Sequence, residues 1–145
     1  MTLFDDLNLN IEYITVETYF RYIIADLVPS IDKCLYLDAD LVVNGTLKEF
    51  YNTDIKDYYC AGVEDIFINK IGYKKEISFD SSDLYINAGM LLMNLEKIRN
   101  ENMVEKLFFN NQEWKEKIRF QDQDIINITF KNKILAVDSI YNFTG

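Results

Sequence analysis

The 145-residue sequence contains no histidine. Within this chain, that absence excludes a Ser-His-Asp or Cys-His catalytic pair and any zinc site with histidine ligands. A metal ion held by these residues would need oxygen ligands, which favours magnesium, manganese or calcium.

Basic residues are also few: 15 Lys and Arg stand against 24 Asp and Glu, for a net charge of −9. The chain has no Lys- or Arg-dense stretch that could form the basic face required for binding nucleic acid. The acidic balance instead suits a cationic partner, or acidic side chains gathered around a metal ion. We therefore expect no nucleic-acid partner.

Cysteine, proline and glycine are scarce, with two, one and five residues. Cys34 and Cys60 lie in apolar runs without CxxC spacing, which predicts small buried thiols of a reduced, intracellular protein. With no linker, low-complexity tract or repeat, the sequence predicts one domain over residues 1–145. The chain has neither a leader nor a run of membrane-spanning length. We expect a cytoplasmic protein without a transmembrane segment, with peripheral contact at the inner face of the membrane as an option.

The most informative stretch is the apolar run Leu35–Val43, which carries two carboxylates and is predicted to be a buried strand. Burying two acids is costly unless something pairs with them. At a side-chain period of two, Asp38 and Asp40 would point to the same side, roughly 6.6 Å apart along the chain. The context carries the information, because 14 aspartates give about one Asp-x-Asp triplet by chance. This arrangement suggests a site for a cation, a hydroxyl-rich ligand, or both.

Arg21 lies in a helix that the sequence predicts up to about Val28, where Pro29 ends it. One interpretation is a solvated arginine or a surface ion pair. The other is a guanidinium that reaches a carboxylate or phosphate at the end of the adjoining strand. Spacing alone favours the first.

A second predicted strand, Tyr58–Val63, also ends in acids, Glu64 and Asp65. Acids after two strands indicate one acidic rim, as in open α/β sheets whose ligands lie beyond the carboxyl ends of the strands. For Asp65, capping of the following helix is an equally good explanation.

The buried run Leu84–Met93 is interrupted by Asn87, Ala88 and Gly89. The asparagine must find hydrogen-bond partners, and the two small residues leave room for a group to approach the backbone closely. A β-bulge is a structural explanation compatible with both.

The last third of the chain is predicted to be mainly helical. Asn94 is a good N-cap for a long helix with a break at Asn110-Asn111. A buried helix follows around residues 121–130, and its acids, Asp122 and Asp124, are explained by the helix dipole alone. Residues 134–137 are predicted to form the last strand.

Four segments now stand in one order: Tyr19–Tyr22, Leu35–Val43, Tyr85–Asn94 and Phe120–Asn127. Together they resemble family 8 of the retaining glycosyltransferases, which includes bacterial lipopolysaccharide galactosyl- and glucosyltransferases and glycogenin. The similarity covers about residues 11–143, and the ordered set is far more specific than any single segment.

This resemblance implies an α/β, GT-A-like fold, in which helices flank a mixed sheet. It implies transfer of galactose or glucose from a UDP-sugar to a glycan or lipopolysaccharide-type acceptor, with retention of anomeric configuration. It also implies manganese or magnesium as the cofactor.

By the same resemblance, Asp38 and Asp40 would bind the metal, which would bridge to the diphosphate of the donor. Gln123 would stabilise an oxocarbenium-like state in a front-face substitution, with Asp122 as the alternative nucleophile. Asp65 would help to bind the acceptor. The donor-binding residues implied are Arg21, Asp38, Ala39, Asp40, Asn87, Ala88, Asp122 and Gln123.

The sequence departs from the family pattern at both ends. It lacks the N-terminal strand and acidic loop that hold uracil and ribose, and the later His-x-x-Gly-x-x-Lys-Pro-Trp segment that supplies a third metal ligand. We therefore expect one truncated domain that is inactive or nearly so on its own. The alternative is a non-catalytic domain that acts through self-association, such as a homodimer formed at an exposed sheet edge, or through pairing with another chain.

Overall fold

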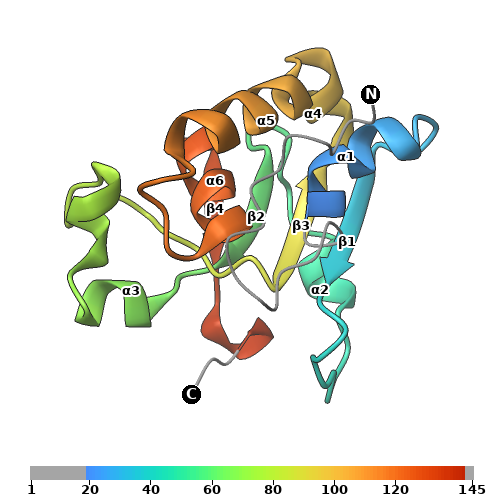
Figure 1. Cartoon of the computed structure of the whole chain (residues 1–145). Helices are drawn as coiled ribbons and strands as arrows, with labels where there is room; N and C mark the ends of the chain where they lie inside the picture. Colours follow the sequence, from blue (N-terminus) through green and yellow to red (C-terminus); the bar gives the residue numbers. More distant parts are fainter. Residues whose placement is uncertain (1–18, 143–145) are drawn as a thin grey trace.

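The computed structural model describes residues 19–142, which form a four-stranded mixed sheet with the strand order β1-β3-β2-β4 (Figure 1). The strands are β1 (Lys33–Leu37), β2 (Cys60–Val63), β3 (Met90–Asn94) and β4 (Ile134–Val137). β3 runs antiparallel to both β1 and β2, whereas β2 and β4 are parallel. The expected mixed sheet is confirmed.

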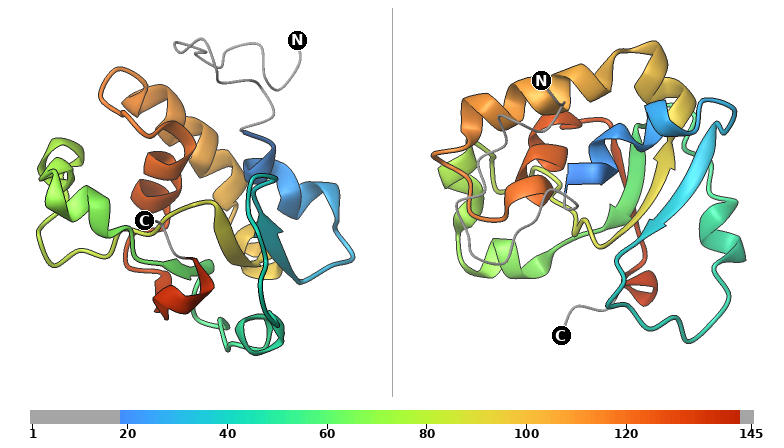
Figure 2. Two further views of the ribbon diagram at one scale, coloured as in Figure 1. Left: turned by 90° about the horizontal axis from the view of Figure 1, so that it is seen from below. Right: turned by 45° about the vertical axis from the view of Figure 1, so that its right-hand side comes forward.

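Helices cover the two faces of the sheet unequally. α1 (Phe20–Leu27), α4 (Leu95–Asn100), α5 (Met103–Trp114) and α6 (Gln121–Thr129) lie on one face. The opposite face carries the short elements α2 (Lys48–Tyr51) and η3 (Ser139–Tyr141), as the left view of Figure 2 shows. α3 (Ile66–Lys70) and η2 (Tyr73–Ile77) lie beyond the end of β2.

β3 is central to the core because its side chains supply both faces of the sheet. Leu91 and Met93 pack among the four larger helices, whereas Met90 and Leu92 pack toward α2. This alternation follows from the period of two along a strand. A fully buried Leu contributes about 1.5–3 kcal/mol to stability, so both layers are fixed to the sheet through this one strand.

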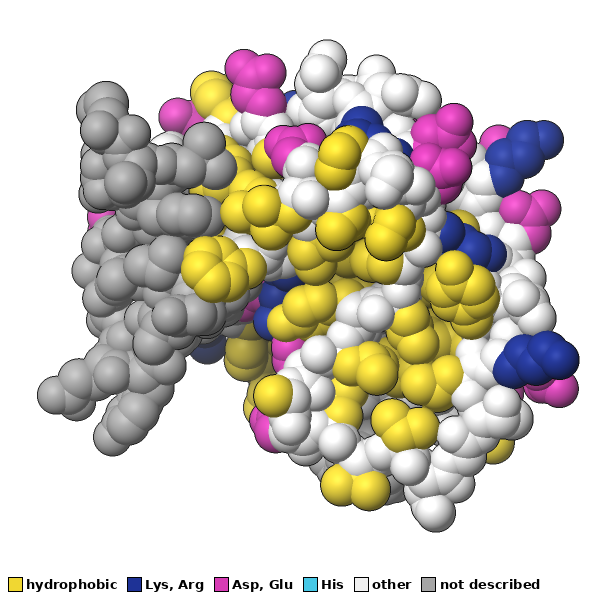
Figure 3. Space-filling view, turned by 90° about the vertical axis from the view of Figure 1, so that its right-hand side faces the viewer, with side chains coloured by type: hydrophobic (Ala, Val, Ile, Leu, Met, Phe, Trp, Pro, Cys, Tyr) yellow, Lys and Arg dark blue, Asp and Glu magenta, His cyan; other side chains and the backbone are white. Residues whose placement is uncertain are grey.

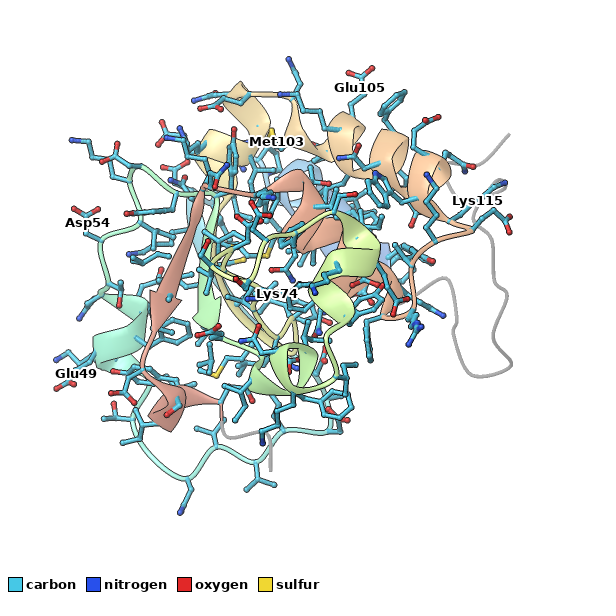
Figure 4. All side chains as sticks on the ribbon, turned by 90° about the vertical axis from the view of Figure 1, so that its left-hand side faces the viewer. Glu49, Asp54, Lys74, Met103, Glu105 and Lys115 are labelled. Carbon is cyan, nitrogen blue, oxygen red and sulfur yellow. The ribbon has the colours of Figure 1, made fainter. Side chains whose placement is uncertain are left out.

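The observed elements differ from the predicted ones at three places. β1 ends at Leu37, so residues 38–43 do not extend it. The long helix is broken at Asn102, in left-handed conformation at φ 53°, and not at residues 110–111. The mixed apolar and basic segment from Ile66 to Ile77 predicts an exposed Lys74, but this lysine, labelled in Figure 4, is buried. Its ammonium group donates to the carbonyls of Ser81 and Asp83.

Other expectations agree with the structure. Strand β4 has the predicted bounds, and α6 is the predicted buried helix with acids in its first turn. Asn94 caps α4 by accepting a hydrogen bond from the backbone of Lys97. Both cysteines are free thiols, although only Cys60 is buried as predicted and Cys34 is partly exposed. Within residues 19–142, no helix has the length and apolar character needed to cross a membrane.

Candidate active site

A pocket of ≈ 320 Å³ opens where the end of β1, the start of β3 and the start of α6 meet. Its wall consists of Arg21, Asp38, Asn87–Gly89 and Arg119–Gln123. This volume is at the lower end of the range of about 300–1,000 Å³ typical of small-molecule sites. The pocket brings together residues from four segments that are far apart in the sequence.

Arg21 connects the different walls of this pocket. Although it is only 8% exposed, its Nη1 donates to the carbonyl of Ala88 at 2.8 Å and its Nη2 to Asp38 at 2.9 Å. Its Nε lies 2.8 Å from Asp122 Oδ2. The interpretation favoured by spacing, a solvated or surface arginine, is therefore wrong. The guanidinium reaches the carboxylate at the adjoining strand end because α1 packs directly against this edge of the sheet.

Tyr36 completes the anchoring of Asp38 and was missed by the sequence analysis. Its hydroxyl donates to Asp38 Oδ1 at 2.7 Å, and the Arg21 guanidinium lies 4.5 Å above its ring. Burial and the hydrogen bond to Asp38 raise the pKa of Tyr36 to about 12. The signal was available, because the predicted strand Leu35–Val43 would place Tyr36 and Asp38, two residues apart, on the same side.

Asp40 does not extend from the sheet beside Asp38 as predicted. Because β1 ends at Leu37, residues 38–41 form a turn in which the backbone N–H of Leu41 bonds to the carbonyl of Asp38 at 3.4 Å. Ala39 and Asp40 are exposed on this turn and do not line the pocket. The expected same-side pair on an extended strand is therefore wrong.

The segment Asn87–Gly89 bulges out of the sheet, as the structural explanation proposed. Ala61 pairs with Leu92, but Glu64 pairs with Ile86, so the short stretch 62–63 lies opposite the longer stretch 87–91. Asn127 of α6 fixes the base of the bulge, since its amide both accepts from the Ile86 N–H and donates to the Ile86 carbonyl.

Close approach to Gly89 is also confirmed, and the approaching groups belong to the chain itself. A Cβ at this position would lie 3.1 Å from both Asn87 Oδ1 and Asp38 Oδ2. The Asn87 oxygen accepts from the Gly89 N–H and from Asn142 Nδ2, each at 2.9 Å. Among residues 19–142, its NH₂ group has no hydrogen-bond acceptor, and Asn87 lines the pocket.

Asp122 is the buried acid of the pocket, only 8% exposed. Burial raises its pKa to about 6, with Arg21 opposing that rise and Asp38 adding to it. Although Arg21 Nε is close, the N–H is not aligned with Oδ2, and neither atom has a hydrogen-bond partner among the described residues. A buried acid with a perturbed pKa and unused hydrogen-bonding capacity is typical of a functional site.

Gln123 is held by three neighbours. Its Oε1 accepts from the N–H of Ala88 at 2.9 Å, and its Nε2 donates to Asp65 Oδ2 at 3.1 Å and to the Tyr85 hydroxyl at 3.3 Å. Asp65 is buried, does not line the pocket, and caps α3 through the N–H of Phe67. The capping explanation for Asp65 is confirmed, and its acceptor-binding role stays a prediction.

Three further pocket residues, Arg119, Phe120 and Gln121, had not been singled out. Gln121 has a left-handed backbone with φ 47°, and its buried Oε1 has no partner within residues 19–142. A non-glycine residue in this conformation is unusual and often marks a site. No sequence signal could have found it, because glutamine gives no warning of positive φ.

Comparison with known proteins identifies the class of protein to which this fold and site belong. A family model described as glycosyl transferase family 8 matches residues 4–145. The chain belongs to this family.

Solved structures and curated relatives agree with this assignment. The galactosyltransferase LgtC, solved in complex with donor and acceptor sugar analogues, superimposes with a TM-score of 0.84 at 34% identity, over 92% of this chain and 48% of LgtC. The expected GT-A fold is thereby confirmed. The glycosyltransferase GlyA of Streptococcus pneumoniae is 40% identical over 89% of this chain, and lipopolysaccharide 1,3-galactosyltransferase of Salmonella typhimurium is 33% identical over 88%. The chain spans only 17% and 40% of those two proteins.

Proposed function

We propose that this chain forms the sugar-binding part of a retaining hexosyltransferase, which transfers galactose or glucose from a UDP-sugar to a glycan or lipopolysaccharide-type acceptor. The single observation that carries the proposal is the position of Arg21. It is a buried arginine that contacts both Asp38 and Asp122 in the wall of a pocket. Family membership supplies the reaction class, and the names of the relatives suggest the hexose and the acceptor.

The pocket offers complementary groups for a hydroxyl-rich ligand. Within residues 19–142, the NH₂ group of Asn87 has no acceptor and Gln121 Oε1 has no donor. Asp122 Oδ2 accepts no hydrogen bond there, although Arg21 Nε lies 2.8 Å away. Because leaving such groups buried and unpaired costs about 1–3 kcal/mol each, sugar hydroxyls that bond to them would bind favourably. Arg21, Asp38, Ala88 and Gln123 complete the donor site in this proposal, with Ala39 and Asp40 on the adjacent turn.

A divalent cation fits the turn after β1 as a partial site. Both hydrogen bonds that Asp38 accepts from described side chains go to Oδ1, which leaves Oδ2 available, and Asp40 is exposed two residues further on. No cluster of three or more acidic or cysteine side chains within residues 19–142 would complete the coordination. Asp38 and Asp40 would therefore supply two ligands to manganese or magnesium. The metal would neutralise the departing diphosphate.

For the retaining step we propose front-face substitution, in which the departing phosphate oxygen helps to deprotonate the acceptor. Gln123 would stabilise the positive charge that develops on the sugar, because its carbonyl oxygen carries partial negative charge. An amide is a poor nucleophile compared with a carboxylate, so Asp122 is the alternative for a covalent route. Asp65 would act at the acceptor side.

The test is transfer by the complete gene product, supplied with UDP-galactose or UDP-glucose, manganese and a glycan acceptor. We expect release of UDP and a product with the anomeric configuration of the donor, measured by NMR. Isothermal titration of this 145-residue chain alone with UDP and manganese should give little heat, and micromolar binding would contradict our view that it is only part of the site. No UDP release with any hexose donor would refute the proposed activity.

The metal site has its own test, with a control of equal charge change. The variant Asp38→Asn/Asp40→Asn should lose the rise in Tm that manganese gives the wild type, because two oxygen ligands are weakened. The control Glu49→Gln/Asp54→Asn removes two exposed acids near α2, labelled in Figure 4, and should keep it. An equal manganese shift in wild type and in the Asp38/Asp40 variant would show that the metal binds elsewhere.

A second candidate, self-association without catalysis, is favoured by one specific observation. β1 is the edge strand of the described sheet, and apolar side chains gather on the molecular face around it (Figure 3). Four apolar residues close to β1 are exposed: Leu37 at its end, Val42 and Val43 shortly after it in the sequence, and Tyr51, whose hydroxyl donates to the Lys33 carbonyl. An exposed edge beside apolar surface favours pairing with a second chain. Analytical ultracentrifugation at low protein concentration tests this candidate. Sedimentation as a dimer would support it, and sedimentation as a monomer alone would count against it.

A further inference from the structure

Asp124 is completely buried, two residues beyond the acid of the pocket, and takes no part in lining it. Four donors converge on its carboxylate. The Tyr85 hydroxyl donates to Oδ1 at 2.6 Å, and the Tyr73 hydroxyl donates to Oδ2 at 2.6 Å. The backbone N–H groups of Arg119 and Phe120 also donate to Oδ2, at 3.0 and 2.8 Å. A carboxylate so fully used by the protein is not free to react with a substrate.

The two backbone bonds explain how the chain enters α6. They hold the N–H groups of residues 119 and 120 just before the left-handed Gln121, which turns the chain into the helix. Left-handed backbone costs a non-glycine residue of order 1–2 kcal/mol, so it persists only where surrounding bonds impose it. Asp124 thereby fixes one wall of the pocket from behind.

The tyrosine bonds determine the direction of a second set of hydrogen bonds. Burial raises the pKa of both tyrosine hydroxyls, so each keeps its single proton at neutral pH. Tyr85 gives that proton to Asp124 and can therefore only accept from Gln123 Nε2. Asp65 likewise can only accept from Nε2, whereas the N–H of Ala88 requires Oε1.

These constraints leave the Gln123 amide with one orientation. Both Nε2 hydrogens are used, and Ala88 occupies one lone pair of Oε1. The second lone pair of Oε1 is the only hydrogen-bonding capacity that remains to the amide. We propose that Asp124, acting through Tyr85, is a positioning residue that holds Gln123 as an acceptor-only group at the pocket. This inference rests on the proposed function for its catalytic consequence, but its structural content is independent of that function.

The structure supplies a matched pair of variants for the test, Tyr85→Phe and Tyr73→Phe. Both tyrosines are 0% exposed and both donate to Asp124 at 2.6 Å. Only Tyr85 also contacts Gln123, whereas the Tyr73 hydroxyl accepts from the Arg119 N–H at 2.9 Å. A purely structural role for Asp124 predicts equal effects of the two changes. The positioning role predicts similar losses of Tm but a loss of turnover for Tyr85→Phe alone.

The first readout is independent of activity. In ¹⁵N-labelled complete gene product, the side-chain NH₂ signals of Gln123, assigned from their absence in Gln123→Ala, should shift in Tyr85→Phe and stay in place in Tyr73→Phe. The second readout is transfer from the UDP-sugar, where Tyr85→Phe should lower kcat about five- to tenfold, the effect of one neutral hydrogen bond, with KM for the donor little changed. Equal shifts in both variants, or none in either, would overturn the proposal.

Asp124→Asn keeps the experiment decisive if Tyr85→Phe does not fold. An amide NH₂ directed at Tyr85 would free the tyrosine proton to point at Gln123, which would then have to turn its amide against the N–H of Ala88. The Gln123 NH₂ signals should move strongly, and unchanged signals would refute the inference. If the wild type transfers no sugar at all, the proposed function fails, whereas the NMR comparison still decides the positioning role.

Discussion

Gly89→Ala offers the sharpest test of the pocket geometry. The new Cβ would lie 3.1 Å from Asn87 Oδ1 and 3.1 Å from Asp38 Oδ2, with Asp38 Cγ at 3.7 Å. Both oxygens belong to anchored groups, because Asp38 is held by Arg21 and Tyr36, and the Asn87 amide by two hydrogen bonds. Relief requires a shift of a few tenths of an ångström, which lengthens these bonds.

The magnitude follows from two opposing effects. Overpacking of this kind costs about 1–3 kcal/mol, and the lower entropy of the unfolded chain returns about 0.4–1 kcal/mol when alanine replaces glycine. The free energy of unfolding should therefore fall by no more than roughly 2.6 kcal/mol, a loss of at most about 10 °C in Tm for a chain of this size. Binding should suffer as well, because Asp38 and Asn87 both move.

The assay is titration of the complete gene product with UDP-galactose or UDP-glucose in manganese, beside urea unfolding. We expect Kd to rise about tenfold, as for the loss of one good polar contact. Gly45→Ala is the matched control, because a Cβ there meets nothing within 4 Å. It should leave Kd unchanged. If Gly89→Ala binds the donor as tightly as Gly45→Ala does, the packing of Asp38 and Asn87 around residue 89 does not matter for the site.

Three further predictions concern the charged and amide groups around the pocket. Arg21→Lys should lower kcat/KM for the UDP-sugar by more than about tenfold, because an ammonium cannot reproduce the two directed hydrogen bonds together with the close contact to Asp122. Arg99→Lys, at a site away from the pocket, should not lower it. Asp122→Asn should raise the free energy of unfolding by about 1–3 kcal/mol at pH 7; the gain should shrink as the pH falls from about 6 toward 3.8, because the wild-type acid is then protonated too. A gain independent of pH would contradict the assignment. Asn127→Asp should lower Tm by roughly 4–8 °C, since a carboxylate cannot donate to the Ile86 carbonyl, and the exposed Asn100→Asp should change it little.

The elements that the sequence predicted well are those with local causes. The strand at residues 134–137, the caps by Asn94 and Asp65, and the bulge at residues 87–89 depend on apolar runs, side-chain oxygens and small residues. Each of these signals acts over a few neighbouring residues. The four segments that carry the family resemblance also meet around one pocket, which no local signal could indicate.

The predictions that failed concern residues whose position depends on contacts with residues far away in the sequence. Spacing along α1 could not reveal that Arg21 reaches Asp38, because this bond depends on how the helix packs on the sheet. The strand period placed Asp40 beside Asp38, but the chain turns once Leu37 is passed. Asp124 was explained by the helix dipole, a local cause, whereas its four hydrogen bonds come from Tyr73, Tyr85 and the residues before the helix.

The charges of Arg21, Asp38 and Asp122 do not balance, and this imbalance affects the pKa of Asp122. One guanidinium faces two carboxylates, the buried Asp122 and the partly exposed Asp38, so the cluster carries one negative charge more than Arg21 can pair. Burial and Asp38 raise the pKa of Asp122 against the opposing effect of Arg21. A ligand or cation that contributes positive charge or hydroxyl donors at this point would relieve the cluster, since buried unpaired charge is costly. The unpaired charge thus makes the site less stable than apolar packing would be. A binding partner that pairs with this charge would gain the corresponding free energy.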